Sequence, residues 1–149
     1  MAVGISKISI NLPFPLLPYI SIANFGDKMP TLIKSPTAIK STGTKPKIIQ
    51  EFAGRINSKH TQVSVARMTS PEGWEEPGQR PEFEEITLVL RGMLRVDYED
   101  GQLDVFEGEM VIAKIGEWVK YSTPQVGGAE YIAVCVPAFS PETVHRDSE

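Results

Sequence analysis

The sequence predicts an all-β fold, built as an antiparallel sandwich or barrel. From His60 onward, short runs of apolar and β-branched residues follow one another, separated by Gly, Asp and Pro. No helical period stands between these runs, and the chain holds no internal repeat or low-complexity tract. Many short strands with turn residues between them are typical of antiparallel sandwiches and barrels.

The expected elements follow in chain order. Residues 30–46 are rich in proline and lysine and predict an extended segment draped over the core. Residues 47–56 predict one short helix that ends near Gly54. Residues 86–98 predict two short strands that meet at Gly92. Further strands are expected at 61–68, 102–106, 109–115, 118–122 and 129–136.

The domain organisation predicts one β domain at residues 47–149, with a C-terminal tail, after an N-terminal extension at residues 1–46. Three prolines interrupt the apolar run within residues 1–28, so a signal peptide or a membrane span is not expected there. Two interpretations stay open. Either Met29 is the natural start, or the extension is an arm that packs on a neighbouring subunit.

The composition limits which kinds of partner the protein can bind and which cellular compartment is expected. The 15 basic and 19 acidic residues of the 149-residue chain give a net charge of -4, which argues against nucleic acid or an anionic membrane as partner. A small-molecule ligand or another protein is therefore expected. Cys135 is the single cysteine and lies in an apolar run, which predicts a small buried side chain, no intrachain disulfide and a cytoplasmic setting.

Two glycine-bounded patterns carry a family resemblance. The first resembles the cupin motif G-x5-H-x-H-x3-E-x6-G, and the second resembles the cupin motif G-x5-P-x-G-x2-H-x3-N. The residues at the motif positions are Gly73, Gln79, Pro81, Glu85 and Gly92, then Gly108, Lys114, Gly116, Val119 and Thr123. The resemblance spans residues 47–137. It implies the double-stranded β-helix, or jelly-roll barrel, of the small single-domain cupins.

Strand alternation assigns side chains to the two faces of this barrel. Glu85 and Thr87 share one face with Val89, and Ile86 and Leu88 lie on the opposite face with Leu90. In the resembling family the first face is the pocket wall. The pocket is then mostly apolar, and its polar candidates are Gln79, Glu85, Thr87 and Tyr121.

The resemblance also implies a metal site of three histidines and one carboxylate, which suits Mn, Fe, Ni or Zn. Here Glu85 keeps the carboxylate position, Gln79 offers a weak amide oxygen, and Pro81 and Val119 offer no ligand. A rebuilt site would draw on His60, at the start of a strand, or on His145 in the tail. The expectation is therefore either no cofactor or one divalent ion held by Glu85, Gln79 and His60.

Glu85 is the leading catalytic candidate, with Tyr121 as a second proton carrier. A carboxylate in an apolar pocket is expected to be protonated, paired with Arg80 or another base, or bound to a cation. The alternative is a purely structural buried ion pair. Trp74 and Trp118 either stack on a ligand at the barrel mouth, or plug the ends of the barrel or lie in a dimer contact.

Two functions follow from the sequence. The first is a small cupin that binds a polar metabolite in its pocket, with its catalytic status open. The alternative is a metal-dependent isomerase, epimerase or lyase, less readily a dioxygenase, with a rebuilt site around Glu85. The apolar outer face of Ile86, Leu88 and Leu90 must be covered, either by the extended N-terminal segment or by a second subunit, and we predict a homodimer.

Overall fold

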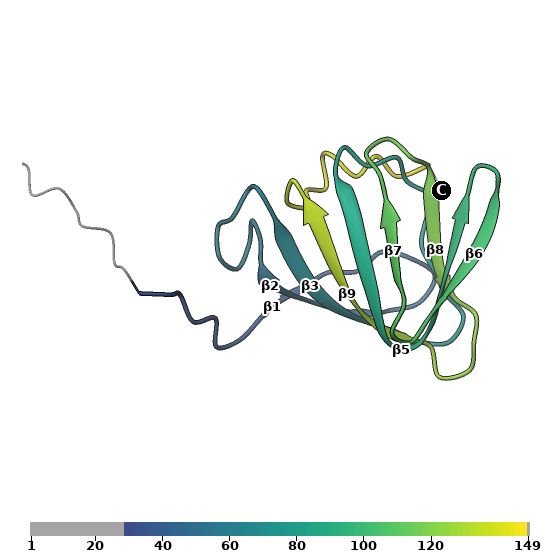
Figure 1. Ribbon diagram of the computed structural model, residues 1–149, viewed down its shortest axis with the longest axis horizontal. Helices are drawn as coiled ribbons and strands as arrows, with labels where there is room; N and C mark the ends of the chain where they lie inside the picture. Colours follow the sequence, from purple (N-terminus) through teal and green to yellow (C-terminus); the bar gives the residue numbers. More distant parts are fainter. Residues whose placement is uncertain (1–28, 149) are drawn as a thin grey trace, which may run out of the picture. The chain divides into compact units, whose positions relative to one another are not determined.

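The computed structural model describes residues 29–148, and those from Leu32 onward form one compact unit (Figure 1). The predictions about residues 1–28 lie outside the described residues. The described part is all strand and irregular chain. Its nine strands are β1 (Thr37–Ile39), β2 (Ile48–Ala53), β3 (Ser64–Ser70), β4 (Trp74–Glu75), β5 (Glu84–Tyr98), β6 (Gly101–Phe106), β7 (Met110–Ala113), β8 (Val119–Thr123) and β9 (Ala129–Val136).

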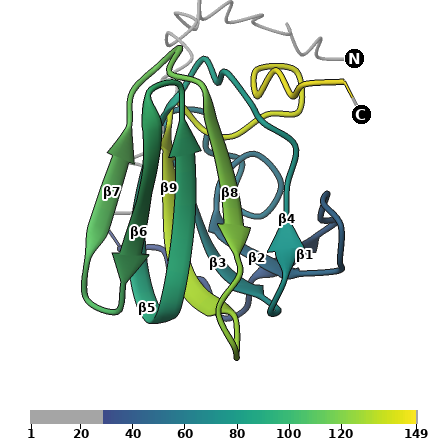
Figure 2. The same ribbon diagram turned by 90° about the vertical axis from the view of Figure 1, so that its right-hand side faces the viewer.

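The strands form two antiparallel sheets that share β5 (Figure 2). The first sheet has the order β1-β2-β3-β9-β5, with β7 on the far side of β5. In the second sheet, β6 and β8 flank the later half of β5, and β4 pairs with β8. The predicted all-β barrel is confirmed.

Strand β5 corrects one prediction, because it is a single bent strand where two short strands were expected. Its pairing with β9 shifts register between Val89 and Arg91, and Gly92 has a φ of 77°. A Cβ at Gly92 would lie 2.1 Å from the carbonyl oxygen of Gly128, so only glycine fits this bend. The bend lets one strand pass from the first sheet into the second.

Strand β2 corrects a second prediction, because residues 47–56 were expected to form a helix. Ile48–Ala53 pairs with β1 on one side and β3 on the other. A helix of this length is marginal by itself, and backbone pairing on both sides of a strand is the more stable arrangement. The segment before it also joins the sheet, since β1 falls within the predicted extension.

The main core lies between the two sheets. Trp74 and Leu94 are fully buried, and they pack with Val89, Val96, Val105, Ala113, Val119, Tyr121, Ala129 and Tyr131. A smaller cluster forms where Phe83 and Cys135 meet the C-terminal segment. Cys135 is buried as expected, and burial raises the pKa of its thiol well above the usual range. Residues 29–148 include no helix that could cross a membrane.

Candidate functional site

A cavity of about 370 Å³ opens beside the first sheet. Its walls come from β1, β2, β3, β5, β8 and β9, from the loop after β4, and from the C-terminal segment. The apolar wall residues include Ile39, Ile49, Met68, Ala133 and Phe139. Polar side chains also line the cavity, and those that bear on a functional site are described below. A cavity of this size and character suits a small organic molecule.

Glu85 lies on β5, where it is opposite Cys135 of β9 and Ala113 of β7. Its side chain lines the cavity and is 9% exposed. Gln79 Nε2 donates to Glu85 Oε2 across 3.5 Å. Burial, and after it the negative charge of Glu76, raise the pKa of Glu85 to about 7, while the positive charges of Lys47 and Arg146 oppose this rise. Glu85 is therefore able to exchange a proton near neutral pH.

Glu76 is a second buried carboxyl group that the motif comparison did not identify. It follows β4, faces the same cavity and is 7% exposed. Burial raises its pKa, and the positive charges of Lys47 and Arg146 oppose that rise. One signal in the sequence could have found it. Alternation from the buried Trp74 places Glu76 on the inward face.

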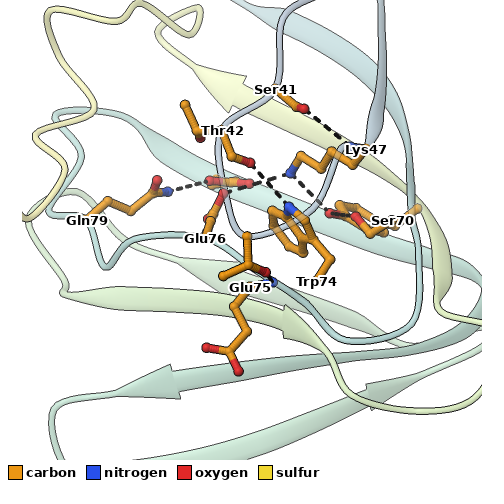
Figure 3. A network of polar contacts seen from close by, with 11 residues as sticks. Ser41, Thr42, Lys47, Ser70, Trp74, Glu75, Glu76 and Gln79 are labelled. Carbon is orange, nitrogen blue, oxygen red and sulfur yellow. Dashed lines mark hydrogen bonds and ion pairs between the residues drawn. The ribbon is translucent and has the colours of Figure 1, made fainter. Parts of the chain in front are cut away.

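Lys47 is the deeply buried cation of this cavity (Figure 3). Its side chain is 5% exposed, and its Nζ lies 3.8 Å from Glu76 Oε2. The same nitrogen lies 3.8 Å from the centre of the Trp74 ring and donates to Tyr131 Oη across 3.4 Å. Tyr131 is in turn bonded to Ser70 Oγ at 2.9 Å. Glu76, Glu85, Lys47 and Tyr131 thus line the cavity together, at what is called here the cavity floor, and the core residue Trp74 packs against Lys47.

Tyr121, on β8, faces the cavity and is 4% exposed. Within residues 29–148, its buried hydroxyl has no hydrogen-bond partner. Burial raises the pKa of the phenol well above its usual value, and the charges of Glu85 and Glu76 act in the same direction. Tyr121 therefore holds its proton and offers a free donor to a ligand.

The two motifs of the sequence meet at Gln79. Gln79 and Val119 exchange backbone hydrogen bonds, with Gln79 N donating to Val119 O at 2.9 Å and Val119 N donating to Gln79 O at 3.0 Å. Gln79 is 3% exposed and lines the cavity. The structure thus brings together Gln79, Glu85 and Tyr121 of the predicted set.

The C-terminal segment closes one end of the cavity, and in Figure 1 it runs in yellow along one end of the strands. It pairs with the loop before β5, where Arg80 N donates to His145 O at 3.1 Å and Asp147 N donates to Gly78 O at 2.8 Å. This pairing brings Arg146 to the cavity. The Nε of Arg146 is buried and has no partner within the described part of the chain.

Other predicted site residues lie elsewhere. His60 is exposed, its Nδ1 is 2.7 Å from Ser58 Oγ, and it does not line the cavity with Glu85 and Gln79. Thr87 is fully buried and does not line the cavity. Trp74 is a core residue whose indole N–H donates to the backbone, and it faces Lys47. Trp118 lies outside the cavity, with its indole N–H donating to Asp147 Oδ2 at 2.8 Å.

The expected partner of Glu85 also differs from the observed one. Arg80 is exposed and forms an ion pair with Glu99. The cations near Glu85 are Lys47 and Arg146. They come from segments far before and far after Glu85 in the chain, so the spacing of the motifs gave no sign of them. The imidazole of His145 lies 2.5 Å from Glu82 on the surface.

The donor set does not fit the metal site that the motifs imply. Transition metals in such sites need imidazole or thiolate ligands. Among the described residues, the cavity lining offers four carboxyl groups, one amide, the thiol of Cys135 and no imidazole, and burial raises the pKa of that thiol so that it keeps its proton. Residues 29–148 contain no group of three or more His, Cys, Asp or Glu side chains placed to hold a metal ion. Lys47 also places a positive charge beside Glu76, where a cation would bind.

No protein-family model matches the chain. Among curated proteins, it is similar to Endoribonuclease YbeY of Myxococcus xanthus (strain DK1622), with 40% identity over 102 residues. That stretch is 68% of this chain and 35% of the relative, so the chain spans about a third of that protein.

Solved structures resemble the chain in fold. They include the polyketide cyclase RemF from Streptomyces resistomycificus (TM-score 0.64, 15% identity, 81% of this chain and 86% of that one). A variant of oxalate decarboxylase from Bacillus subtilis also matches, with a TM-score of 0.61 and 17% identity over 79% of this chain and 33% of that one. An RmlC-like cupin from Shewanella frigidimarina matches with a TM-score of 0.60 and 12% identity, over 76% of this chain and 94% of that one. The sheet topology and these likenesses agree with the sequence motifs, and the chain has the fold of the cupin superfamily.

Proposed function

We propose that the protein binds a small molecule in the 370 Å³ cavity, with the apolar body of the ligand against β1, β2 and β9 and its polar end at the charged floor. The observation that supports this most directly is the unpartnered hydroxyl of Tyr121, which faces the cavity beside Glu85 within the described residues. A buried donor without a partner is costly in a folded protein, and a bound ligand would satisfy it.

A thermal-shift screen of small organic acids, alcohols and amines tests this proposal. The decisive pair of variants lies on β9, where alternate residues face opposite sides. Ala133→Leu places extra volume in the cavity wall, and Val134→Leu places the same kind of side chain on the outer face. Stabilising compounds should lose their effect in Ala133→Leu and keep it in Val134→Leu. Equal stabilisation in both variants would show that binding occurs elsewhere.

A second candidate is an enzyme that moves a proton on the bound molecule. Glu85, with a pKa of about 7, would take or give the proton, and the protonated Tyr121 would stabilise a developing oxygen anion. RemF, a neighbour in fold, is named a polyketide cyclase. A metal-dependent isomerase or lyase is less well supported, because the cavity wall within residues 29–148 lacks the ligands that such a site needs.

The relative from Myxococcus xanthus suggests a cellular context. The chain matches about a third of a protein named as an endoribonuclease. The net charge of -4 argues against RNA as the ligand of this domain itself. We therefore propose that the chain is a ligand-binding domain that accompanies an activity held elsewhere. Retention of the purified chain by immobilised RNA at about 150 mM salt would contradict this assignment. The single buried cysteine supports our proposal that the chain works in the cytoplasm.

We also propose a homodimer formed through the outer face of the first sheet. Ile86 lies opposite Ile112, and Leu88 lies opposite Met110. Met110 and Ile112 are 54% and 53% exposed, which leaves a continuous apolar patch for a second copy to cover. Light scattering should give twice the chain mass for the wild type and the single mass for Ile112→Lys. A monomeric wild type would exclude this dimer.

A further inference from the structure

Two of the three buried carboxyl groups of the cavity, Glu76 and Glu85, need a nearby positive charge, whereas the third, Glu51, accepts two backbone N–H donors. An isolated carboxylate removed from water is unstable unless it is paired or protonated. In the motif that this chain resembles, a metal ion supplies that charge. Here Glu85 keeps its motif position, Glu76 lines the same cavity, and the residues at the histidine positions are Gln79, Pro81 and Val119.

Lys47 supplies a positive charge from within the chain. Its Nζ lies 3.8 Å from Glu76 Oε2 and 3.8 Å from the centre of the Trp74 ring. The segment that carries Lys47 enters the sheet as β2, directly beside the cavity. The backbone N–H of Lys47 also donates to Ser41 Oγ at 3.3 Å, which ties this segment to the chain before it (Figure 3).

The ammonium group is incompletely satisfied by the protein. It has three donors, and its contacts with Tyr131 and Glu76, at 3.4 and 3.8 Å, are longer than the roughly 2.7–2.9 Å usual for a charge-assisted hydrogen bond. Tyr121 Oη and Arg146 Nε face the same cavity and have no partner within residues 29–148. Three donor groups that line the cavity therefore lack a full complement of acceptors within the described residues.

We propose that Lys47 is the resident cation of this site, in place of a metal ion, and that it selects ligands with a carboxylate head on an apolar body. The carboxylate would accept from Lys47, Tyr121 and Arg146, and the body would lie against the apolar wall. This inference rests on the proposed function, since it assigns a ligand class to the same cavity.

Three probes with one body and different heads test the ligand class: 2-naphthoate, 2-naphthylmethanol and 2-naphthylmethylammonium, each titrated by calorimetry. The wild type should bind 2-naphthoate at least ten-fold more tightly than either of the others. Lys47→Met should abolish that preference, and Lys47→Arg should keep it. Lys45→Met is the matched control, because Lys45 lies on the same segment with its Nζ on the exposed carbonyl of Glu72.

Equal binding of the three probes, or tighter binding of the ammonium probe, would overturn the ligand class and leave the proposed function standing. No binding of any probe would count against the proposed function itself. If Lys47→Met fails to fold, the ranking of the probes on the wild type still decides. A last titration, with Zn²⁺ and Mn²⁺, compares the wild type with Glu85→Gln. Stoichiometric metal binding that depends on Glu85 would overturn the role given to Lys47.

Discussion

The two halves of strand β5 share one backbone and serve different purposes. Before the bend at Gly92, Glu85 faces the cavity and Thr87 is buried with a hydroxyl that lacks a partner in the described part of the chain. After the bend, Leu94 and Val96 are buried in the main core. The buried polar groups of the first half lower the free energy of unfolding. The buried apolar side chains of the second half raise it and offset that loss. The site is therefore supported by a core that lies one bend away on the same strand.

The largest effect is expected in the second half. Leu94→Ala should lower the free energy of unfolding by roughly 2 to 5 kcal/mol, because Leu94 is fully buried and the cavity left behind would not close completely. Urea unfolding measures the change. The matched control is Leu103→Ala on β6, where the side chain is 39% exposed and a loss below about 1 kcal/mol is expected. Similar losses in the two variants would contradict this account of the core.

In the first half, Glu85→Gln should stabilise the protein at high pH. The pKa of Glu85 rises from 4.5 to about 7 on folding, so the folded state keeps a proton that the unfolded chain releases. The free energy of unfolding therefore falls as the pH rises from 4.5 to about 7, by roughly 3 kcal/mol at most, and stays low above that range.

The Gln side chain does not titrate, so the variant should lack this part of the decline. The two proteins should differ least below pH 4.5, where Glu85 is protonated in both states. Unfolding curves from about pH 4 to 8.5 give the difference. A variant less stable than the wild type at the alkaline end of this range would show that the Glu85 carboxylate is well paired.

Tyr121→Phe removes another buried polar group from the cavity, and we expect a smaller effect on stability than for Glu85→Gln. Its hydroxyl has no partner within residues 29–148, so the free energy of unfolding should stay the same or rise by about 1 kcal/mol. Binding of 2-naphthoate should weaken several-fold, because the ligand loses one donor. Calorimetry and urea unfolding on one preparation measure both quantities. A clear loss of stability would mean that the hydroxyl has a structural role.

The smallest effect is expected at the surface of the second half. Arg95 on β5 forms two hydrogen bonds with Asp104 on β6, at 2.7 and 2.9 Å, and both side chains are about a third exposed. This contact lowers the pKa of Asp104, so its contribution is lost as the solution becomes acidic. Asp104→Asn should cost less than about 1 kcal/mol at neutral pH. A larger loss in urea unfolding would show that this pair is more than a surface contact.

Strand alternation and the spacing of the glycines were enough to predict the barrel and the inward direction of Glu85. They succeeded because both are local properties of a strand and its turns. The helix expected at residues 47–56 was wrong, because pairing with β1 and β3 outweighs the preference of so short a segment. The cations of the site, Lys47 and Arg146, could not be predicted from the motifs. Their positions depend on how the segment before β2 and the C-terminal segment after β9 pack against the cavity.

The contact between Lys47 and Trp74 gives the site an optical reporter. An indole ring that is fully buried, with an ammonium group 3.8 Å from its centre, should emit at a wavelength that responds to any change in that charge. Trp118 is the other tryptophan of the chain, and replacing it with phenylalanine would leave Trp74 as the sole source of indole emission. Events at the cavity floor then become visible in real time, without a label and whatever the natural ligand is.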